Sequence, residues 1–270
     1  MAFYHLTLIA LIQGLTEFLP VSSSGHLILL PGLTGIKDQG NVIDVAAHVG
    51  TLFAVMLYFR SDVAEVLAGL PRLLTGRLDT KGARLALFLV IATIPVIVLG
   101  LIIKVTGLAD AMRNITVIGW TMLVFGLLLY WFDQRTDQSR DIKTLTLPDA
   151  IKLGLWQMIA LIPGTSRSGI VITGALAMGF ERKDAARVAM LMSIPTIIAS
   201  GTLSSLDLIG GSVPVYDTTV VVALSFLAAL VALSLMMRLL NTLSFSPYVI
   251  YRVILGIVLL VLAYSGWSGF

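Results

Sequence analysis

The chain has 270 residues, of which 57% are hydrophobic and 12% are charged, whereas soluble domains average about 25% charged residues. Together with a mean hydropathy of +0.97, this composition excludes a disordered or ordinary soluble protein. The formal net charge of +3 does not indicate nucleic-acid binding, because the basic residues lie mostly in short segments between apolar stretches. The absence of cysteine excludes disulfides, thiolate metal sites and cysteine nucleophiles.

Six apolar stretches are long enough to cross a hydrocarbon core of about 30 Å as helices. They are Asn41 to Phe59, Leu85 to Ile103, Ile115 to Phe132, Val188 to Leu206, Thr218 to Met237, and the segment from Arg252 to the C-terminus. The first carries Asp44 and His48, which are costly in lipid, so one of its faces is expected to contact protein or water. The sequence does not define a role for His48.

Four shorter apolar stretches form two pairs, each interrupted by a cluster of Ser, Gly and Pro. They are Leu6 to Pro20 with His26 to Leu33, and Leu153 to Pro163 with Ile170 to Phe180. Irregular backbone at membrane depth is tolerated only where it is buried in protein or lines a watery cavity. We therefore expect two re-entrant helical hairpins whose tips enclose a site. Two kinked ordinary helices are the alternative.

The two interrupted stretches are related by an offset of 144 residues, which superposes Gln13 on Gln157 and Ser22 on Ser166. The same offset superposes Ser24 on Ser168, Gly25 on Gly169 and Gly35 on Gly179. Each hairpin is followed by three spanning helices, so the second copy must enter the membrane from the opposite side. The sequence thus predicts an all-α polytopic membrane protein of one domain, residues 1–270, with inverted repeats over approximately 1–131 and 145–270.

Lys and Arg residues predict the orientation, because cytoplasmic loops retain positive charge. Fourteen of the 18 basic residues, including Arg238 and Arg252, can be placed in loops on the cytoplasmic side without conflict. This placement leaves the C-terminus outside. Arg167 is the one basic residue that cannot be placed in a loop.

The first interrupted stretch combines a carboxylate with an amide. Glu17 follows Gln13 by four residues, so on a helix both polar groups share one face, an arrangement suited to a divalent cation or a proton. An acidic residue in apolar surroundings is a candidate functional group. Capping of the neighbouring serine turn by Glu17 is the alternative.

A run of small residues opens the next half-helix, where free backbone N–H groups and the helix dipole favour an anion. These residues are Ser22, Ser23, Ser24 and Gly25. His26 stands three residues after Ser23, within reach on one helical face, as a base must be to deprotonate a hydroxyl nucleophile. Serines at helix starts are also common caps, so a structural role stays open.

The second interrupted stretch places a guanidinium among small residues that again open a half-helix. Arg167 is flanked by Thr165, Ser166, Ser168 and Gly169. A guanidinium is costly there unless it faces an anion, and its fork of donors matches phosphate oxygens. Together the two stretches predict a phosphate site inside a membrane. A structural ion pair with the carboxylate of the first hairpin is the alternative.

These residues resemble a known family, the undecaprenyl-diphosphatases, also called bacitracin-resistance proteins. The resemblance covers essentially the whole chain and rests on Glu17 to His26, Pro163 to Gly169, and Ser244 to Arg252. It implies an integral membrane enzyme that removes the terminal phosphate of undecaprenyl diphosphate, a C55 isoprenoid diphosphate. That reaction regenerates the lipid carrier for cell-wall synthesis and confers resistance to bacitracin.

The resemblance also implies roles for individual residues. Ser23 corresponds to the nucleophile, His26 to its base and acid, and Arg167 to the phosphate clamp. Glu17 and Gln13 match an acidic pair associated with a divalent cation, Mg²⁺ or Ca²⁺, although Gln13 lacks the charge and weakens that site.

The expected partners are undecaprenyl diphosphate and the lipid bilayer of the bacterial inner membrane, with no nucleic acid, and a homodimer stays open. The family implies a site that faces the outer side. A secondary transporter or a polyprenyl-phosphate flippase is the alternative function, because inverted repeats with broken helices are typical of carriers. An intramembrane serine protease is a weaker alternative, because a protease has no use for Arg167.

Overall fold

The computed structural model describes residues 1–35, 40–206 and 214–265. Within these ranges the chain is helical, and six helices are long and apolar enough to cross a membrane. They are α3 (Asn41–Tyr58), α5 (Lys81–Thr106), α7 (Ile115–Arg135), α10 (Arg182–Leu206), α11 (Val215–Leu239) and α12 (Ser246–Tyr264). The six predicted spans are thereby confirmed, and the prediction of an all-α polytopic membrane protein with them.

The four shorter apolar stretches fold as four short helices in two hairpins. Hairpin 1 consists of α1 (Phe3–Thr16) and α2 (Ser23–Thr34), joined by turn 1, residues 17–22. Hairpin 2 consists of α8 (Leu147–Met158) and α9 (Arg167–Ala177), joined by turn 2, residues 159–166, which begins with the 3₁₀ turn η2 (Ile159–Leu161). The backbone breaks therefore fall at the predicted Ser, Gly and Pro clusters. Entry of the hairpins into a membrane from opposite sides stays a prediction.

The two turns end in the same local geometry. Ser22 and Ser166 have φ angles of 73° and 71°, and they are the two non-glycine residues with positive φ in the described part of the chain. Each caps the following helix, because its hydroxyl accepts the backbone N–H of Gly25 or Gly169, at 3.3 and 3.2 Å. Backbone strain of this kind clusters at functional sites.

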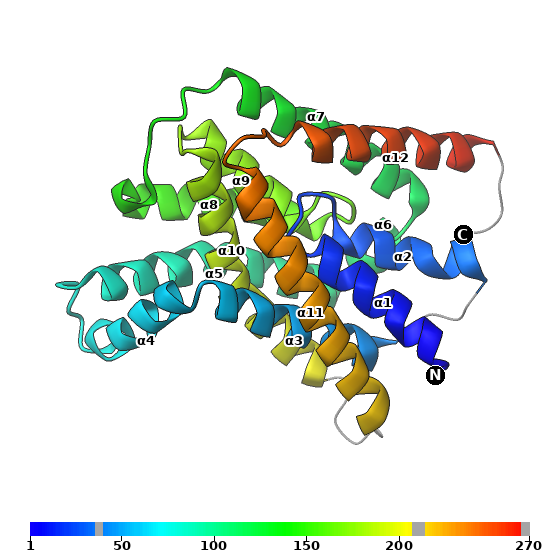
Figure 1. Cartoon of the computed structure of the whole chain (residues 1–270), viewed down its shortest axis with the longest axis horizontal. Helices are drawn as coiled ribbons and strands as arrows, with labels where there is room; N and C mark the ends of the chain where they lie inside the picture. Colours follow the sequence, from blue (N-terminus) through cyan, green and yellow to red (C-terminus); the bar gives the residue numbers. More distant parts are fainter. Residues whose placement is uncertain (36–39, 207–213, 266–270) are drawn as a thin grey trace.

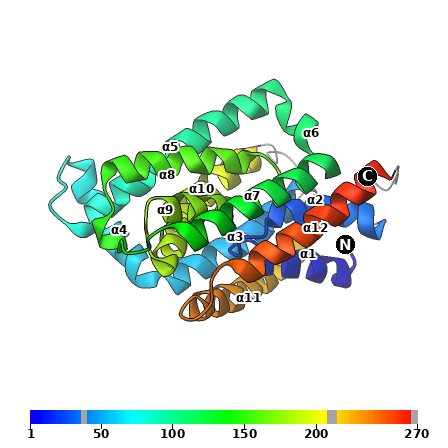
Figure 2. The same cartoon turned by 90° about the horizontal axis from the view of Figure 1, so that it is seen from above.

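Hairpin 2 packs against three of the spanning helices, with α8 on α5 and α9 on α7 and α10. Figure 2 shows α12 running beside α7, while α11 packs on α3 and α1. Figure 1 shows α9 beside α8 and α10, and its residues from Ser168 to Leu176 are all buried. The short helices α4 (Arg60–Leu74) and α6 (Leu108–Met112) and the 3₁₀ turn η1 (Ile142–Thr144) complete the fold.

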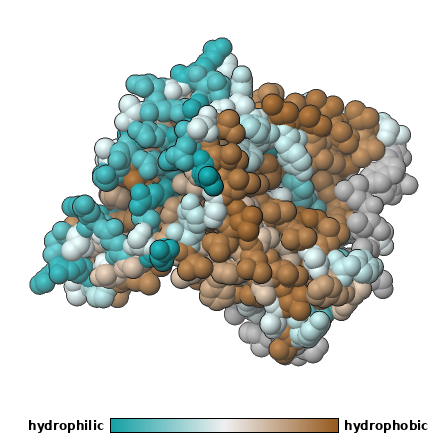
Figure 3. Space-filling model, viewed as in Figure 1, coloured by the Kyte–Doolittle hydropathy of each residue, from teal (hydrophilic) through white to brown (hydrophobic). Residues whose placement is uncertain are grey.

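Hydrophilic and hydrophobic residues separate along the molecule. In Figure 3 the hydrophilic residues gather at the end where α4 lies, and apolar residues cover α11 and α12. Ion pairs hold the connections together at the hydrophilic end: Arg187 with Asp62, Arg182 with Asp133, and Arg140 with Asp149. The connections predicted to be cytoplasmic thus lie together.

Candidate active site

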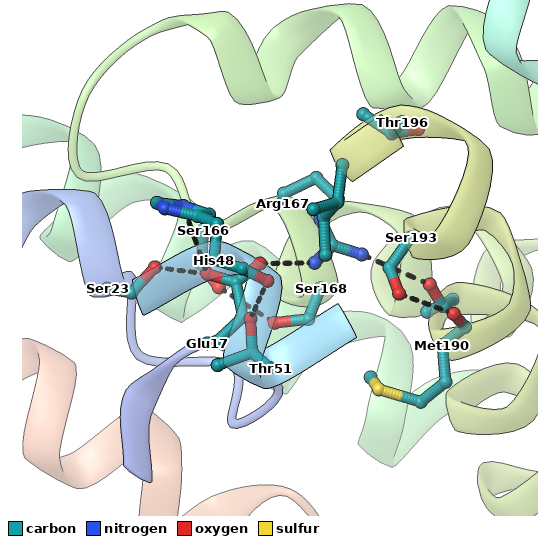
Figure 4. Close-up of polar contacts among 12 residues, drawn as sticks. Glu17, Ser23, His48, Thr51, Ser166, Arg167, Ser168, Met190, Ser193 and Thr196 are labelled. Atoms are coloured by element: carbon teal, nitrogen blue, oxygen red, sulfur yellow. Dashed lines mark hydrogen bonds and ion pairs between the residues drawn. The ribbon is translucent and has the colours of Figure 1, made fainter. Parts of the chain in front are cut away.

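Turn 1 and turn 2 meet at one buried carboxylate. Glu17 caps the C-terminus of α1, and its side chain is 7% exposed. Arg167 donates from Nη2 to Glu17 Oε1 at 2.5 Å, and Ser23 donates from Oγ to Glu17 Oε2 at 2.6 Å (Figure 4). Gln13 adds a third donor, Nε2, at 2.9 Å from Oε2. The fold therefore brings the hydroxyl of one hairpin and the guanidinium of the other to the same group.

A polar cavity of about 170 Å³ opens over this carboxylate. It is lined by Glu17, Ser22, Ser23, Ser24, His48, Ala160, Ser166, Arg167, Thr196, Ile197 and Ser200. Three of the predicted binding residues, Ser22, Ser24 and Ser166, thus reach it. The lining offers hydroxyl groups, one carboxylate and one guanidinium, a set of groups that suits a strongly solvated anion.

Four other predicted binding residues are buried and do not line the cavity: Gly25, Thr165, Ser168 and Gly169. The backbone N–H of each glycine is taken by the serine that caps its helix. The Ser168 hydroxyl donates to the Leu19 carbonyl at 3.0 Å and so links the two hairpins. In the structure these residues build the turns, and their contact with the ligand stays a prediction.

His26 is directed away from the predicted pairing with Ser23, and its role as a base stays a prediction. Its Nδ1 lies 2.7 Å from the Ser22 carbonyl oxygen, and its Nε2 lies 2.5 Å from the Tyr251 hydroxyl. The imidazole also stacks on the Tyr251 ring, with centroids 5.7 Å apart. A spacing of three residues places Ser23 and His26 near one face of α2, but partners 225 positions away determine the direction of the ring.

His48 lies at the cavity instead. Its Nδ1 lies 2.8 Å from the Asp44 carbonyl oxygen, and its Nε2 lies 3.9 Å from Glu17 Oε2. A second cavity of about 250 Å³ shares His48 and Ser200 with the first and extends past Asn41 and Ser204. The site thus continues toward the end of the molecule where α3 begins. The cost of His48 in an apolar span is the only sequence signal of its place.

Arg252 is buried in α12 with 0% of its surface exposed, so its predicted place in a cytoplasmic loop is wrong. Its guanidinium donates to carbonyl oxygens of both turns and of α7. Counting charges along the sequence does not reveal this, because Arg252 lies close enough to the start of the span to be assigned to the preceding loop. Arg167 is therefore not the one basic residue outside the loops.

The divalent cation predicted at Gln13 and Glu17 stays a prediction, and these two residues alone offer it few ligands. Both oxygens of Glu17 already accept hydrogen bonds, and the described residues contain no cluster of three or more His, Cys, Asp or Glu that could hold a metal ion. Gln13 Oε1 is buried without a hydrogen-bond partner, but an amide oxygen alone does not hold a hard cation.

These features define a polytopic membrane protein with a serine hydroxyl, a carboxylate and a guanidinium in a buried polar cavity. Residues 6–258 match the family model described as "Bacitracin resistance protein BacA". The match covers more than half of the chain, and the chain belongs to this family.

Three curated proteins similar to the chain are named undecaprenyl-diphosphatase. The chain is 63% identical over 267 residues to the undecaprenyl-diphosphatase of Ruegeria pomeroyi, and the alignment covers 98% of this chain and 100% of that protein. It is 61% identical, with the same coverage, to the undecaprenyl-diphosphatases of Jannaschia sp. and Dinoroseobacter shibae.

Proposed function

We propose that this protein is an undecaprenyl-diphosphate phosphatase, which hydrolyses the terminal phosphate of the C55 isoprenoid diphosphate and so recycles the lipid carrier of cell-wall synthesis. Family membership and the names of the relatives support this activity. The observation that carries the proposal is the meeting of Ser23 and Arg167 on Glu17 at a polar cavity. Resistance to bacitracin follows from the same activity.

Arg167 is the proposed clamp for the terminal phosphate. In the structure it is paired with Glu17, which is also the contact that a purely structural role requires. The guanidinium carries five N–H donors, however, and Arg167 lines the cavity, so a phosphate can share it with the carboxylate. First-turn residues of α2 and α9 line the cavity, so the partial positive charge at both helix N-termini lies close to the anion.

Ser23 is the proposed nucleophile and Glu17 its proton acceptor. The Ser23 hydroxyl already donates to Glu17 Oε2, which leaves the lone pairs of Oγ free to attack phosphorus. A bond from Oγ to the terminal phosphorus forms, the anhydride bond breaks, and undecaprenyl phosphate leaves. Water then cleaves the phosphoserine and releases phosphate. Catalysis in such transfers comes mainly from positioning and charge stabilisation.

The membrane setting is part of the proposal. The isoprenoid tail stays in the lipid of the bacterial cell membrane while the diphosphate enters between the turns of two oppositely inserted hairpins. The shared geometry of Ser22 and Ser166 supports a duplicated, inverted arrangement. The cavity that continues past Asn41 and Ser204 supports an opening at the end opposite the basic connections, the outer side. A divalent cation, Mg²⁺ or Ca²⁺, would accompany the diphosphate itself.

Phosphate release by purified protein in detergent micelles tests the proposal. Micelles have no second compartment, so a transporter or flippase without hydrolytic activity releases no phosphate. We expect wild type to release phosphate from undecaprenyl diphosphate and Ser23→Ala to lose at least about 10³-fold in kcat. Ser234→Ala, which alters an exposed serine of α11, is the matched control. No release by wild type, or near-normal turnover by Ser23→Ala, would contradict the proposal.

A further inference from the structure

One side chain of α12 is hydrogen-bonded to both hairpin turns. The Arg252 guanidinium donates to the carbonyl oxygen of Pro20 in turn 1 at 3.4 Å. It also donates to the carbonyl oxygens of Gly164 and Thr165 in turn 2, at 3.3 and 2.8 Å, and to that of Thr121 in α7 at 3.3 Å. Carbonyls of a broken hairpin have no helical partner, and leaving one unpaired in a buried site is destabilising.

Glycines of two neighbouring helices pack closely against the Arg252 side chain. A Cβ on Gly126 of α7 would lie 3.2 Å from Arg252 Cβ, and a Cβ on Gly169 of α9 would lie 3.0 Å from Nη1. Arg252 does not line the cavity at Glu17. Its contacts are therefore with the backbone that carries the site.

The preceding residue, Tyr251, reaches turn 1 by a second route. Its hydroxyl bonds His26 Nε2 at 2.5 Å, and His26 Nδ1 bonds the Ser22 carbonyl oxygen at 2.7 Å. Ser22 has a φ of 73° and directly precedes the proposed nucleophile. Tyr251 thus supports Ser22 through the His26 imidazole, and the strained backbone of Ser22 determines the direction of the Ser23 side chain.

We propose that Tyr251 and Arg252 form a clamp that positions the two hairpin turns for the reaction, and that His26 acts as part of this clamp. The inference rests on the proposed phosphatase function. Arg252 sets the distance between turn 1 and turn 2, while Tyr251 and His26 set the direction of Ser23. Other contacts between the hairpins, such as the Ser168 hydroxyl on the Leu19 carbonyl, join the turns but involve no third helix.

Kinetics separate positioning from substrate binding. A misplacement of about 1 Å at a reacting group costs about 10²-fold in rate. We expect Arg252→Met to lower kcat by about 100-fold while KM changes by less than about threefold. Arg252→Lys retains a charge and three donors and should recover about tenfold of that loss. Arg238→Met, at an exposed position late in α11, is the matched control and should behave as wild type.

A distance measurement tests the clamp without any use of activity. The chain has no cysteine, so Leu15→Cys in α1 and Leu155→Cys in α8 give one spin-label pair across the two hairpins. Both leucines are exposed, at 42% and 54%. We expect a narrow distance distribution with Arg252 or Lys present and a shifted or broadened one in Arg252→Met.

The outcomes distinguish this inference from the proposed function. If the wild-type protein has no phosphatase activity, the proposed function is wrong, but the spin-label distances still test the clamp. An Arg252→Met variant with kcat within threefold of wild type, or with lost kcat and an unchanged distance distribution, overturns the clamp. If Arg252→Met does not fold, Tyr251→Phe decides. It removes one hydroxyl, and we expect kcat to fall about fivefold at constant KM, whereas wild-type kcat would overturn the role of Tyr251.

Discussion

Arg167 of hairpin 2 and Glu17 of hairpin 1 form a buried ion pair, with Nη2 and Oε1 2.5 Å apart and side chains 14% and 7% exposed. Removing one member of such a pair costs more than the pair itself contributes, because the other charge is left buried without a partner. In a phosphatase the remaining carboxylate would also repel the substrate.

The first prediction concerns this pair. Arg167→Ala should lower kcat/KM by about 10³-fold, because the variant loses the donors that stabilise the phosphate charge in the transition state. The double variant Glu17→Gln with Arg167→Ala should lose less than the sum of the single losses, because the carboxylate charge is gone. Steady-state phosphate release by the four proteins measures this coupling. Additive losses would show that the pair acts as two independent groups.

The second prediction concerns a covalent intermediate. If Ser23 attacks phosphorus, rapid acid quenching during turnover should trap a phosphate on Ser23, and mass spectrometry of the digested protein should locate it. Ser23→Ala should carry no label, and Ser24→Ala, at a neighbouring cavity residue, should still carry it. A parallel quench in alkaline detergent preserves a phosphohistidine, which acid destroys, so a label on His26 there would identify a different nucleophile. Absence of label under both quenches with fast turnover would favour direct attack by water.

Much of the architecture could be predicted because a spanning helix is recognised from the hydrophobicity of one continuous segment of sequence. The stretch Ile115 to Phe132 lacks charges, and α7 begins at Ile115, where Asn114 caps it. The breaks between the short helices follow in the same way from Ser, Gly and Pro, which favour turns over continuous helix. The position of each element along the chain depends on local composition.

The third prediction concerns the strained caps. Ser166→Ala keeps a Cβ at a φ of 71° and loses the hydroxyl that accepts the Gly169 N–H, so both strain and an unpaired donor remain. Ser166→Gly loses the cap but relieves the strain. We expect the glycine variant to be more stable than the alanine variant by about 1–2 kcal/mol. Unfolding of both in mixed micelles with increasing SDS would measure the difference, and the reverse order would contradict the strain.

The fourth prediction compares two glycines. Gly164 in turn 2 has a φ of 86°, and a Cβ there would lie 2.8 Å from the Ile118 carbonyl oxygen. A Cβ on Gly201 in α10 would meet no atom of the described residues outside its own helix within 4 Å. Gly164→Ala should therefore abolish phosphate release, whereas Gly201→Ala should be neutral or stabilise the helix by up to about 1 kcal/mol. Equal melting temperatures for both variants would contradict the packing of turn 2.

The fifth prediction concerns pH and the start of α8. Burial raises the pKa of Asp149, but hydrogen bonds from Arg140 and Thr146 outweigh it and leave the pKa below its ordinary value of 3.8. A carboxyl group with a depressed folded-state pKa contributes stability above its unfolded pKa and loses it as the pH falls through the folded value. Asp149→Asn should thus be less stable than wild type at neutral pH, with the gap closing below about pH 4. Melting curves across this range would show it, and a constant gap would contradict the pairing.

The contacts within the site could not be predicted from the sequence, because they join residues that are far apart in the chain. The ring of His26 is directed by Tyr251, 225 positions away, and no local pattern contains that contact. Arg252 resembles a loop residue in the sequence. The distribution of Lys and Arg predicts on which side of the membrane a loop lies, but it does not predict which arginine is buried in the fold. Ser23 and Arg167 could be predicted as members of the site. The contacts of Glu17 with the serine turn and with Arg167 were each an alternative in the sequence, and the fold shows that both occur together.

The strained serine turns share one backbone form but carry different chemistry. The turn that ends at Ser22 is followed by a hydroxyl that can attack, and the turn that ends at Ser166 is followed by a guanidinium that can hold an anion. Neither half of the chain therefore possesses a complete set of reactive groups. The reactive groups are distributed over the two hairpins, so each hairpin depends on the other for its chemistry.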